Sequence, residues 1–267
     1  MESAGIERAS SNIERKALIL KRLEKDGKVS VNEISDELKV CRETIRRDLR
    51  EMEQEKMVQR IHGGAILSDN IQKVKEYPYL AREIQNYNEK LRICKVAAEL
   101  VEDGDTIFID NSSTTIKMLK NINPKYQVTV ITNSIRLLLE ATLLNNENLT
   151  IVSIGGIFRP KNYSLTGILA NQWSKMFHPN KAFLSCYGVH TEYGLYDSNI
   201  HEIEVKRIML ELSQSTYIMA DHTKIDRSGV VYLNDFSNVN GIITDEPLTK
   251  EQESCIEKNN IELIIAK

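Results

Sequence analysis

The sequence predicts two folded units: a small three-helix unit ending in a β-hairpin, and a larger α/β unit on a mostly parallel, open sheet. Apolar residues recur at helical spacing near the start, whereas from Leu91 short apolar runs alternate with helical segments. Such runs, separated by helices, are typical of a parallel sheet covered on both faces. A length of 267 residues accommodates both cores, and the expected organisation is 1–67, a linker at 68–90, and 91–267.

The small unit begins with a helix over 13–26, in which Leu20 and Leu23 lie on an apolar stripe and Gly27 ends the helix. A brief extended piece follows at 28–31. Ser30 and Glu33 have the spacing of a capping box and predict a second helix that reaches Leu38.

A third helix is expected from Cys41 or Arg42 to about Lys56. Gly63 and Gly64 stand between two short β-prone runs, which predicts a tight hairpin.

The α/β unit is expected to start with a helix. Its predicted helices are 92–101, 114–122, 134–144, about 202–214 and 250–258. Its predicted strands are 106–110, 127–132, 149–156, 181–189, 216–221, 230–233, 241–245 and 261–266.

Composition excludes several classes of protein. Four scattered cysteines without a CxxC pair argue against a zinc site or a disulfide scaffold and favour a reducing, cytoplasmic location. The first residues lack the apolar core of a signal peptide, and no apolar run approaches membrane-spanning length, so no membrane partner is expected. The net charge of −3 gives no sign of a nucleic-acid partner.

The third predicted helix changes that picture locally, because 39–50 holds five basic residues against two acidic ones. Ile45, Leu49 and Met52 share one helix face, and the arginines project from the opposite one. A major groove accepts such a helix, and a hairpin after it would serve as a wing. The alternative is an ordinary solvated face with Glu–Arg pairs. The residues expected at DNA are Arg42, Glu43, Thr44, Arg46, Arg47, Arg50, Arg60 and His62.

The stretches TIRRDL and VQRIHGGA together resemble the winged helix–turn–helix of DeoR-family bacterial transcriptional regulators, and the resemblance extends over essentially the whole chain. The family usually has Ser at the position of Cys41, and Ser would be the better N-cap. A redox role for Cys41 is the less favoured alternative, because a lone cysteine with little basic activation is usually inert.

The loop FIDNSSTTIKML is the main candidate site of the large unit. A strand ends at Asp110, four hydroxyl residues follow (112–115), and a helix is expected to begin there, which favours an anion such as phosphate. The alternative is plain N-capping.

The effector domain of DeoR regulators is similar to phosphosugar isomerases such as ribose-5-phosphate isomerase, so the resemblance implies a phosphorylated sugar as effector. Two departures from the family pattern are Ser112, where the family's loop has Gly, and His190, where relatives often have Asp or Asn. Lys90 is expected just before the first helix of the unit. The residues that the resemblance implies at the effector are Lys90, Asp110, Ser112, Ser113, Thr114, Thr115, Asn133, Gly155, Gly156, Arg159, Glu204, Lys206, Asp221 and Lys224.

The leading hypothesis is a repressor of carbohydrate-metabolism genes that binds operator DNA as a homo-oligomer, a dimer or tetramer, and responds to a sugar phosphate. No cofactor is expected, and no histidine has metal-ligand spacing. One alternative is a phosphosugar isomerase with an accessory N-terminal domain, using Asp221, Glu204 or Asp110 as general base. Another is a protein-interaction module built on the winged helix.

Overall fold

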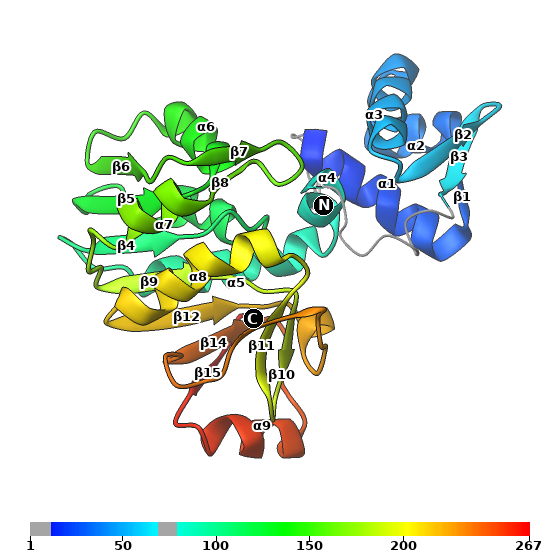
Figure 1. The fold of residues 1–267 in the computed structure, drawn as a ribbon. Coiled ribbons are helices and arrows are strands. Elements are labelled where there is room, and N and C mark those ends of the chain that lie inside the picture. The colour runs from blue at the N-terminus through cyan, green and yellow to red at the C-terminus, as the bar shows by residue number, and fades with distance from the viewer. Residues whose placement is uncertain (1–11, 69–78) are drawn as a thin grey trace, which may run out of the picture. The chain divides into compact units, whose positions relative to one another are not determined.

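The computed structural model describes residues 12–68 and 79–267, which belong to two compact units divided between Tyr87 and Asn88 (Figure 1). The first unit contains α1 (Asn12–Asp26), β1 (Lys28–Ser30), α2 (Val31–Leu38), α3 (Arg42–Gln54), β2 (Val58–Ile61), β3 (Gly64–Leu67) and α4 (Tyr79–Ile84). None of the helices in these described ranges is both long and apolar enough to cross a membrane.

The first unit is a three-helix core closed by an antiparallel sheet in the order β1-β3-β2. The apolar stripes predicted from the sequence are buried: Leu20 and Leu23 of α1, and Ile45, Leu49 and Met52 of α3. The extended piece before α2 is β1, which pairs with β3. The predicted winged helix–turn–helix is therefore confirmed.

Two local predictions for this unit were wrong in detail. Ser30 is the N-cap of α2, but its side chain makes no capping bond, so the capping box does not form. The hairpin turn lies at His62 and Gly63, because Gly64 is already paired with Ile61 inside β3. The segment 68–90 was expected to be a linker that runs into a helix; it contains α4, which packs on α1, and residues 69–78 lie outside the described residues.

The second unit is built on a seven-stranded parallel sheet in the order β15-β14-β12-β9-β4-β5-β6, as the sequence predicted in kind. Its strands are β4 (Thr106–Ile109), β5 (Val128–Thr132), β6 (Leu149–Ser153), β9 (Lys181–Leu184), β12 (Ser215–Met219), β14 (Gly241–Thr244) and β15 (Glu262–Ile265). Its helices are α5 (Tyr87–Glu99), α6 (Ile135–Leu144), α7 (Ile168–Ser174), α8 (Ile200–Leu212) and α9 (Lys250–Glu257). In Figure 1, α7 and α8 lie over the face of the sheet turned to the viewer.

Several elements differ from their predictions. The expected strand 181–189 breaks after Leu184, and its end is β10 (Gly188–His190) of a separate antiparallel sheet with β11 (Gly194–Asp197) and β13 (Val231–Asn234). The expected helix 114–122 is a 3₁₀ helix, η2 (Thr115–Asn121), and a short 3₁₀ turn, η3, covers His222–Lys224. The hairpin of β7 (Ile157–Arg159) and β8 (Ser164–Thr166) and the helix α7 were not predicted.

Candidate functional site

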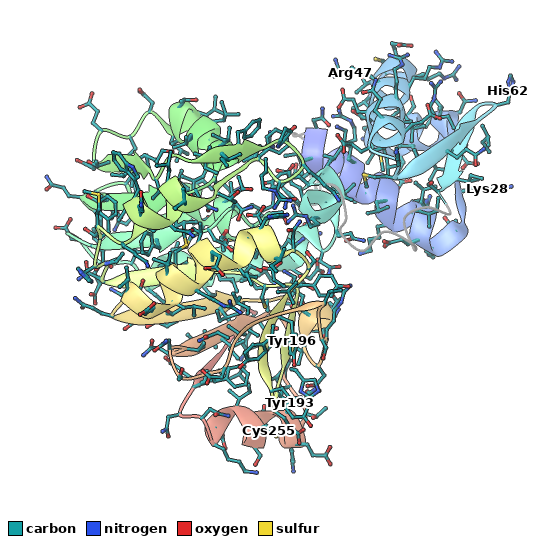
Figure 2. The ribbon with its side chains drawn as sticks, in the orientation of Figure 1. Lys28, Arg47, His62, Tyr193, Tyr196 and Cys255 are labelled. Carbon is teal, nitrogen blue, oxygen red and sulfur yellow. The ribbon has the colours of Figure 1, made fainter. Side chains whose placement is uncertain are left out.

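The outer face of α3 is a row of exposed charged side chains. Arg42, Glu43, Arg46, Arg47 and Arg50 are exposed, while Thr44 is half-buried. Glu43 pairs loosely with Arg46 at 3.5 Å and with Arg50 at 3.9 Å, both at the surface. Figure 2 shows Arg47 projecting from α3. The structure thus brings the predicted arginines to one accessible face, with their guanidinium groups available to a partner.

Two ion pairs that the sequence did not reveal hold α3 against α1. The Arg15 guanidinium donates two hydrogen bonds to the Asp48 carboxylate, from Nε and from Nη2, and both side chains are buried. Lys16 pairs with Glu51 one turn later, and this contact lowers the pKa of Glu51. Asp48 lies beside Leu49 on the buried face of the helix that contains TIRRDL. A charged residue on that face was the one feature of the sequence that indicated a buried ion pair.

The start of α3 is weakly capped. Cys41 is the N-cap, and its side chain makes no capping bond to the backbone. Its Sγ lies 3.1 Å from Thr44 Oγ1, and hydrogen bonding to Thr44 lowers the pKa of this exposed thiol.

The wing presents Arg60 and His62, both exposed, and Figure 2 shows His62 at the tip of the hairpin. Gly63 forms the turn with φ +76°, a conformation that favours glycine. A Cβ at Gly64 would lie 1.9 Å from the Val29 carbonyl oxygen, so the close approach of β3 to β1 requires glycine. The two glycines of the HGGA stretch thus fix the wing.

The second candidate site lies at the carboxyl edge of the parallel sheet. Strand order reverses between β4 and β9, since β5 and β6 lie on one side and β12, β14 and β15 on the other. Ligands of open α/β sheets bind outside the strand ends at such a reversal. Asp110 follows β4, Asn133 follows β5, Ser185 follows β9 and Asp221 follows β12.

Asp110 is the centre of this edge and is fully buried. Its Oδ1 accepts hydrogen bonds from Ser112 N at 3.1 Å and Thr115 Oγ1 at 2.6 Å, and its Oδ2 accepts one from Ser185 N at 3.1 Å. Lys206 Nζ lies 3.4 Å from Oδ2. The carboxylate therefore organises the loop, and Thr114 is held in the turn by a bond from its N–H to Ser112 Oγ.

Two lysines reach this edge in different states. Lys206 is buried between Asp197, at 2.7 Å, and Asp110, and it also donates to the Ser185 carbonyl. Burial opposes its charge, but the two carboxylates outweigh that effect and raise the pKa of Lys206. Lys224 donates to the hydroxyl of Ser185 at 2.9 Å, a neutral partner. Ser185 thus links both lysines, and it was not among the residues predicted from the sequence.

The Gly155–Gly156 loop follows β6, and both residues have positive φ. A Cβ at Gly156 would lie 2.7 Å from the Thr166 carbonyl oxygen, so this glycine lets β8 approach. Asn133 lies beside β8 through its bonds with Leu165, and the Ser113 side chain is buried in the loop after β4.

The structure does not bring Glu204 to the site. Glu204 is exposed and pairs with Arg207 on its own helix, because it faces away from the sheet on α8. Glu202 is the buried acid of α8, and its Oε1 accepts bonds from Arg159, Asn162 and Ser164. Glu204, which the resemblance implied at the effector, is therefore not among the buried residues of this region, whereas Glu202, which was not predicted, is. The position of Glu202 four residues before the buried Lys206 could have identified it, because residues i and i+4 share one face of a helix.

Lys90 also differs from its expected position. It lies in the first turn of α5, not before the helix, and it is buried.

Three buried oxygens close to these loops have no hydrogen-bond partner within the described ranges: Thr114 Oγ1, Asn133 Oδ1 and Glu202 Oε2. An unpaired buried polar atom costs about 1–3 kcal/mol, so such atoms are rarely left unused. Thr114 and Asn133 follow the neighbouring strands β4 and β5, and Glu202 lies on α8 beside Ser164 of β8.

His222, Asp245 and Glu246 form a neighbouring cluster whose ligand-type atoms lie within 4.8 Å of one another. The spacing of the histidines in the sequence predicted no metal ligand among them. Asp245 already accepts bonds from the His222 N–H and ring nitrogen, and an Arg92 nitrogen lies 3.7 Å from its Oδ2. That nearby cation disfavours a metal ion, and the cluster fits a hydrogen-bonded support for η3.

Comparison with known families agrees with this two-unit description. Residues 15–70 match the DeoR-like helix-turn-helix domain, and residues 85–246 match the DeoR C terminal sensor domain. The uncharacterized HTH-type transcriptional regulator YulB of Bacillus subtilis is 37% identical over 94% of this chain and 95% of its own. The HTH-type transcriptional repressor GlcR of the same organism is 29% identical over 95% of this chain and 96% of its own.

Among solved structures, ribose 5-phosphate isomerase A of Methanocaldococcus jannaschii matches 53% of this chain and 55% of its own with a TM-score of 0.40 and 16% identity, a likeness that carries no functional argument. The two family matches and the relatives cover nearly the whole chain. The protein therefore belongs to the DeoR family, and it is an HTH-type transcriptional regulator with an N-terminal DNA-binding domain and a C-terminal sensor domain.

Proposed function

We propose that the protein represses genes of carbohydrate metabolism and that a phosphorylated sugar releases it from DNA. One observation supports the effector part of the proposal: Thr114 and Asn133, which follow the neighbouring strands β4 and β5, each have a buried oxygen without a partner, and Lys224 donates to Ser185, which follows β9 at the point where strand order reverses. The name of the relative GlcR, a transcriptional repressor, supports repression.

In this proposal the phosphate lies against the loop 111–115. Thr114 Oγ1 donates to a phosphate oxygen, and Lys224 supplies the positive charge by exchanging the Ser185 hydroxyl for the phosphate. Lys206 is unsuited to that role, because two carboxylates already neutralise it. The oxygens of Asn133 and Glu202 accept hydrogen bonds from sugar hydroxyls, and Arg159 holds Glu202 in place.

DNA recognition in this proposal uses the arginine face of α3 in a major groove and the wing on the backbone. Arg46 and Arg47 are both exposed near the N-terminal half of the helix, the part that reads bases in helix–turn–helix proteins. A homo-oligomer would place two such helices on paired half-sites. The effector can release DNA only if it binds the DNA-competent and incompetent states with different affinity.

The isomerase alternative is disfavoured by the surroundings of two of its three candidate bases, Asp110 and Glu204. Both oxygens of Asp110 accept hydrogen bonds and face Lys206, and Glu204 is exposed on the far side of α8. A general base needs a free lone pair directed at the proton it removes. We infer that the site binds and reports a sugar phosphate without converting it.

The experiment is fluorescence anisotropy on labelled DNA from upstream of the gene, titrated with a panel of sugar phosphates. We expect salt-dependent, sequence-specific binding that one compound reverses. Thr114→Val removes the hydroxyl with little change in shape, so it should raise the sugar-phosphate concentration needed for release at least tenfold while DNA affinity stays unchanged.

Replacing Arg46 and Arg47 with Ala should instead abolish specific DNA binding and leave sugar-phosphate affinity intact. If the Thr114→Val variant is released from DNA at the same sugar-phosphate concentration as the wild type, the proposed phosphate position is wrong. If the double arginine variant binds specific DNA as tightly as the wild type, α3 is not the helix that recognises the bases.

A further inference from the structure

Helix α7 has its bulky apolar side chains on the outside. Ile168, Leu169 and Trp173 of α7, and Met176 two residues beyond its end, are 50–71% exposed, and the spacing of the three helical residues places them along one side of the helix. Ile157 of β7 is 68% exposed, and its Cδ1 would lie 3.3 Å from a Cβ at Gly167, the residue before the helix. These five residues form the α7 apolar stripe.

The inward side of α7 carries small residues instead. Ala170 and Ser174 are fully buried, and a Cβ at Gly156 would lie 3.0 Å from the Ala170 Cβ. The helix therefore packs closely on its own domain through small side chains and presents large ones to the outside. A surface helix that only covers a core has the reverse arrangement.

The stripe has the size of an interface core. Its five side chains expose on the order of 500 Å² of apolar surface, given roughly 150–250 Å² for a fully accessible large side chain. The largest apolar patch on a monomeric protein is usually about 300–600 Å² and is often an interaction site. A stable dimer buries about 800 Å² per partner, of which roughly 65% is apolar, or about 520 Å².

The stripe carries no charge, which is compatible with a second copy of this chain as the occupant. None of the five side chains carries a charge, so two copies meeting stripe to stripe bring no like charges together. Exposed Gln172 and Lys175 border the stripe and supply a polar rim. We propose that the α7 apolar stripe is the self-association surface of the sensor domain, formed by two chains related by a two-fold axis.

The chain contains a direct probe of this contact, because Trp173 is its single tryptophan and is half-exposed in one copy. The experiment measures molecular mass by analytical ultracentrifugation and tryptophan emission over the same range of concentrations of the full-length protein. We expect the mass to rise from monomer to dimer while the emission shifts to shorter wavelength, with the same midpoint.

The test variant is Ile168→Glu with Met176→Glu, which keeps the tryptophan and adds like charges to both copies. It should weaken self-association at least 100-fold and keep the long-wavelength emission. Val230→Glu is the matched control, because Val230 is also exposed, at 72%, but precedes β13 of the antiparallel sheet. It should associate as the wild type does, and circular dichroism should show both variants folded.

Three results would overturn the proposal: a mass that rises without any change in emission, a double variant that associates as tightly as the control, or a wild-type chain that stays monomeric at all concentrations. This test uses no effector and no DNA, so it is separate from the effector and base-recognition parts of the proposed function, whereas a chain that stays monomeric would also contradict the homo-oligomer proposed there.

Discussion

Arg15 of α1 and Asp48 of α3 form a buried ion pair in which the guanidinium donates a hydrogen bond to each carboxylate oxygen. Hydrogen bonding to Asp48 raises the pKa of Arg15 in spite of burial, so the guanidinium stays charged. The pair joins the first helix to the back of the reading helix. The orientation of the arginine face of α3 therefore depends on a contact made on its opposite side.

Asp48→Ala should leave the Arg15 charge buried without a partner and lower the free energy of unfolding of the DNA-binding domain by about 3–5 kcal/mol. Urea denaturation followed by circular dichroism measures this loss. The double variant Arg15→Met with Asp48→Leu should recover most of it, since both charges are then absent. A loss below about 1 kcal/mol in the single variant would contradict the role assigned to the pair.

The four free cysteines should differ sharply in reactivity. Cys41 is exposed, and the Thr44 hydrogen bonds lower the pKa of its thiol. Burial raises the pKa of Cys94 to about 12 and of Cys186 to about 11. Iodoacetamide at pH 8, with peptide mapping by mass spectrometry, should label Cys41 first and leave both buried thiols unmodified in the folded protein. Equal labelling of Cys94 would contradict the structure.

Cys41→Ser tests the helix start. A serine hydroxyl can accept the N–H bond that the thiol does not accept in this structure, so the DNA-binding domain should gain about 0.5–1 kcal/mol in its free energy of unfolding. Thermal unfolding measured by circular dichroism should show the gain. Cys41→Ala is the control, because it removes the thiol without providing a cap and should give no gain.

The sequence predicted the two units and the parallel sheet because apolar periodicity is a local property. It predicted the outer face of α3 for the same reason, since Ile45, Leu49 and Met52 orient the helix by themselves. The break after Leu184 was not predictable, because the run continues apolar while the chain leaves the sheet for β10. The small residues that let α7 pack, Ala170 and Ser174, give no apolar period.

The candidate site was partly predictable. Asp110 and the hydroxyls after it form one continuous motif, so the loop was identified directly. Ser185 was missed because its bonds to Lys206 and Lys224 join segments far apart in the chain. Glu202 was missed because motif order alone does not reveal a helix face, whereas its 5% side-chain exposure in the structure does.

Glu202 and Glu204 provide a matched pair for the effector site. Glu202→Gln should weaken sugar-phosphate binding at least tenfold, because an amide replaces the carboxylate that Arg159 and Ser164 hold and that faces the ligand in our proposal. Glu204→Gln changes an exposed acid on the same helix and should bind as the wild type does. Isothermal titration calorimetry measures both affinities. Equal sugar-phosphate affinities for the two variants would show that Glu202 is not part of the effector site.

The stability of the sensor domain should depend on pH through His222. Burial opposes protonation of its ring, but the hydrogen bond to Asp245 and the charges of Asp245, Glu246 and Asp221 outweigh this effect and raise its pKa above the ordinary value of 6.5. A nitrogen of Arg92 also lies 3.7 Å from Asp245 Oδ2. A raised pKa in the folded state stabilises the protein fully below the unfolded pKa, and this stabilisation disappears as the pH rises through the folded pKa.

His222→Gln should therefore lower the free energy of unfolding more at pH 5.5 than at pH 8, with the difference shrinking above about pH 6.5. Urea denaturation at a series of pH values measures it. His178→Gln is the control, because His178 is exposed and outside the cluster, and its curve should run parallel to that of the wild type. If the free energy of unfolding of His222→Gln also changes with pH in parallel with that of the wild type, the His222–Asp245 contact does not depend on the charge of the ring.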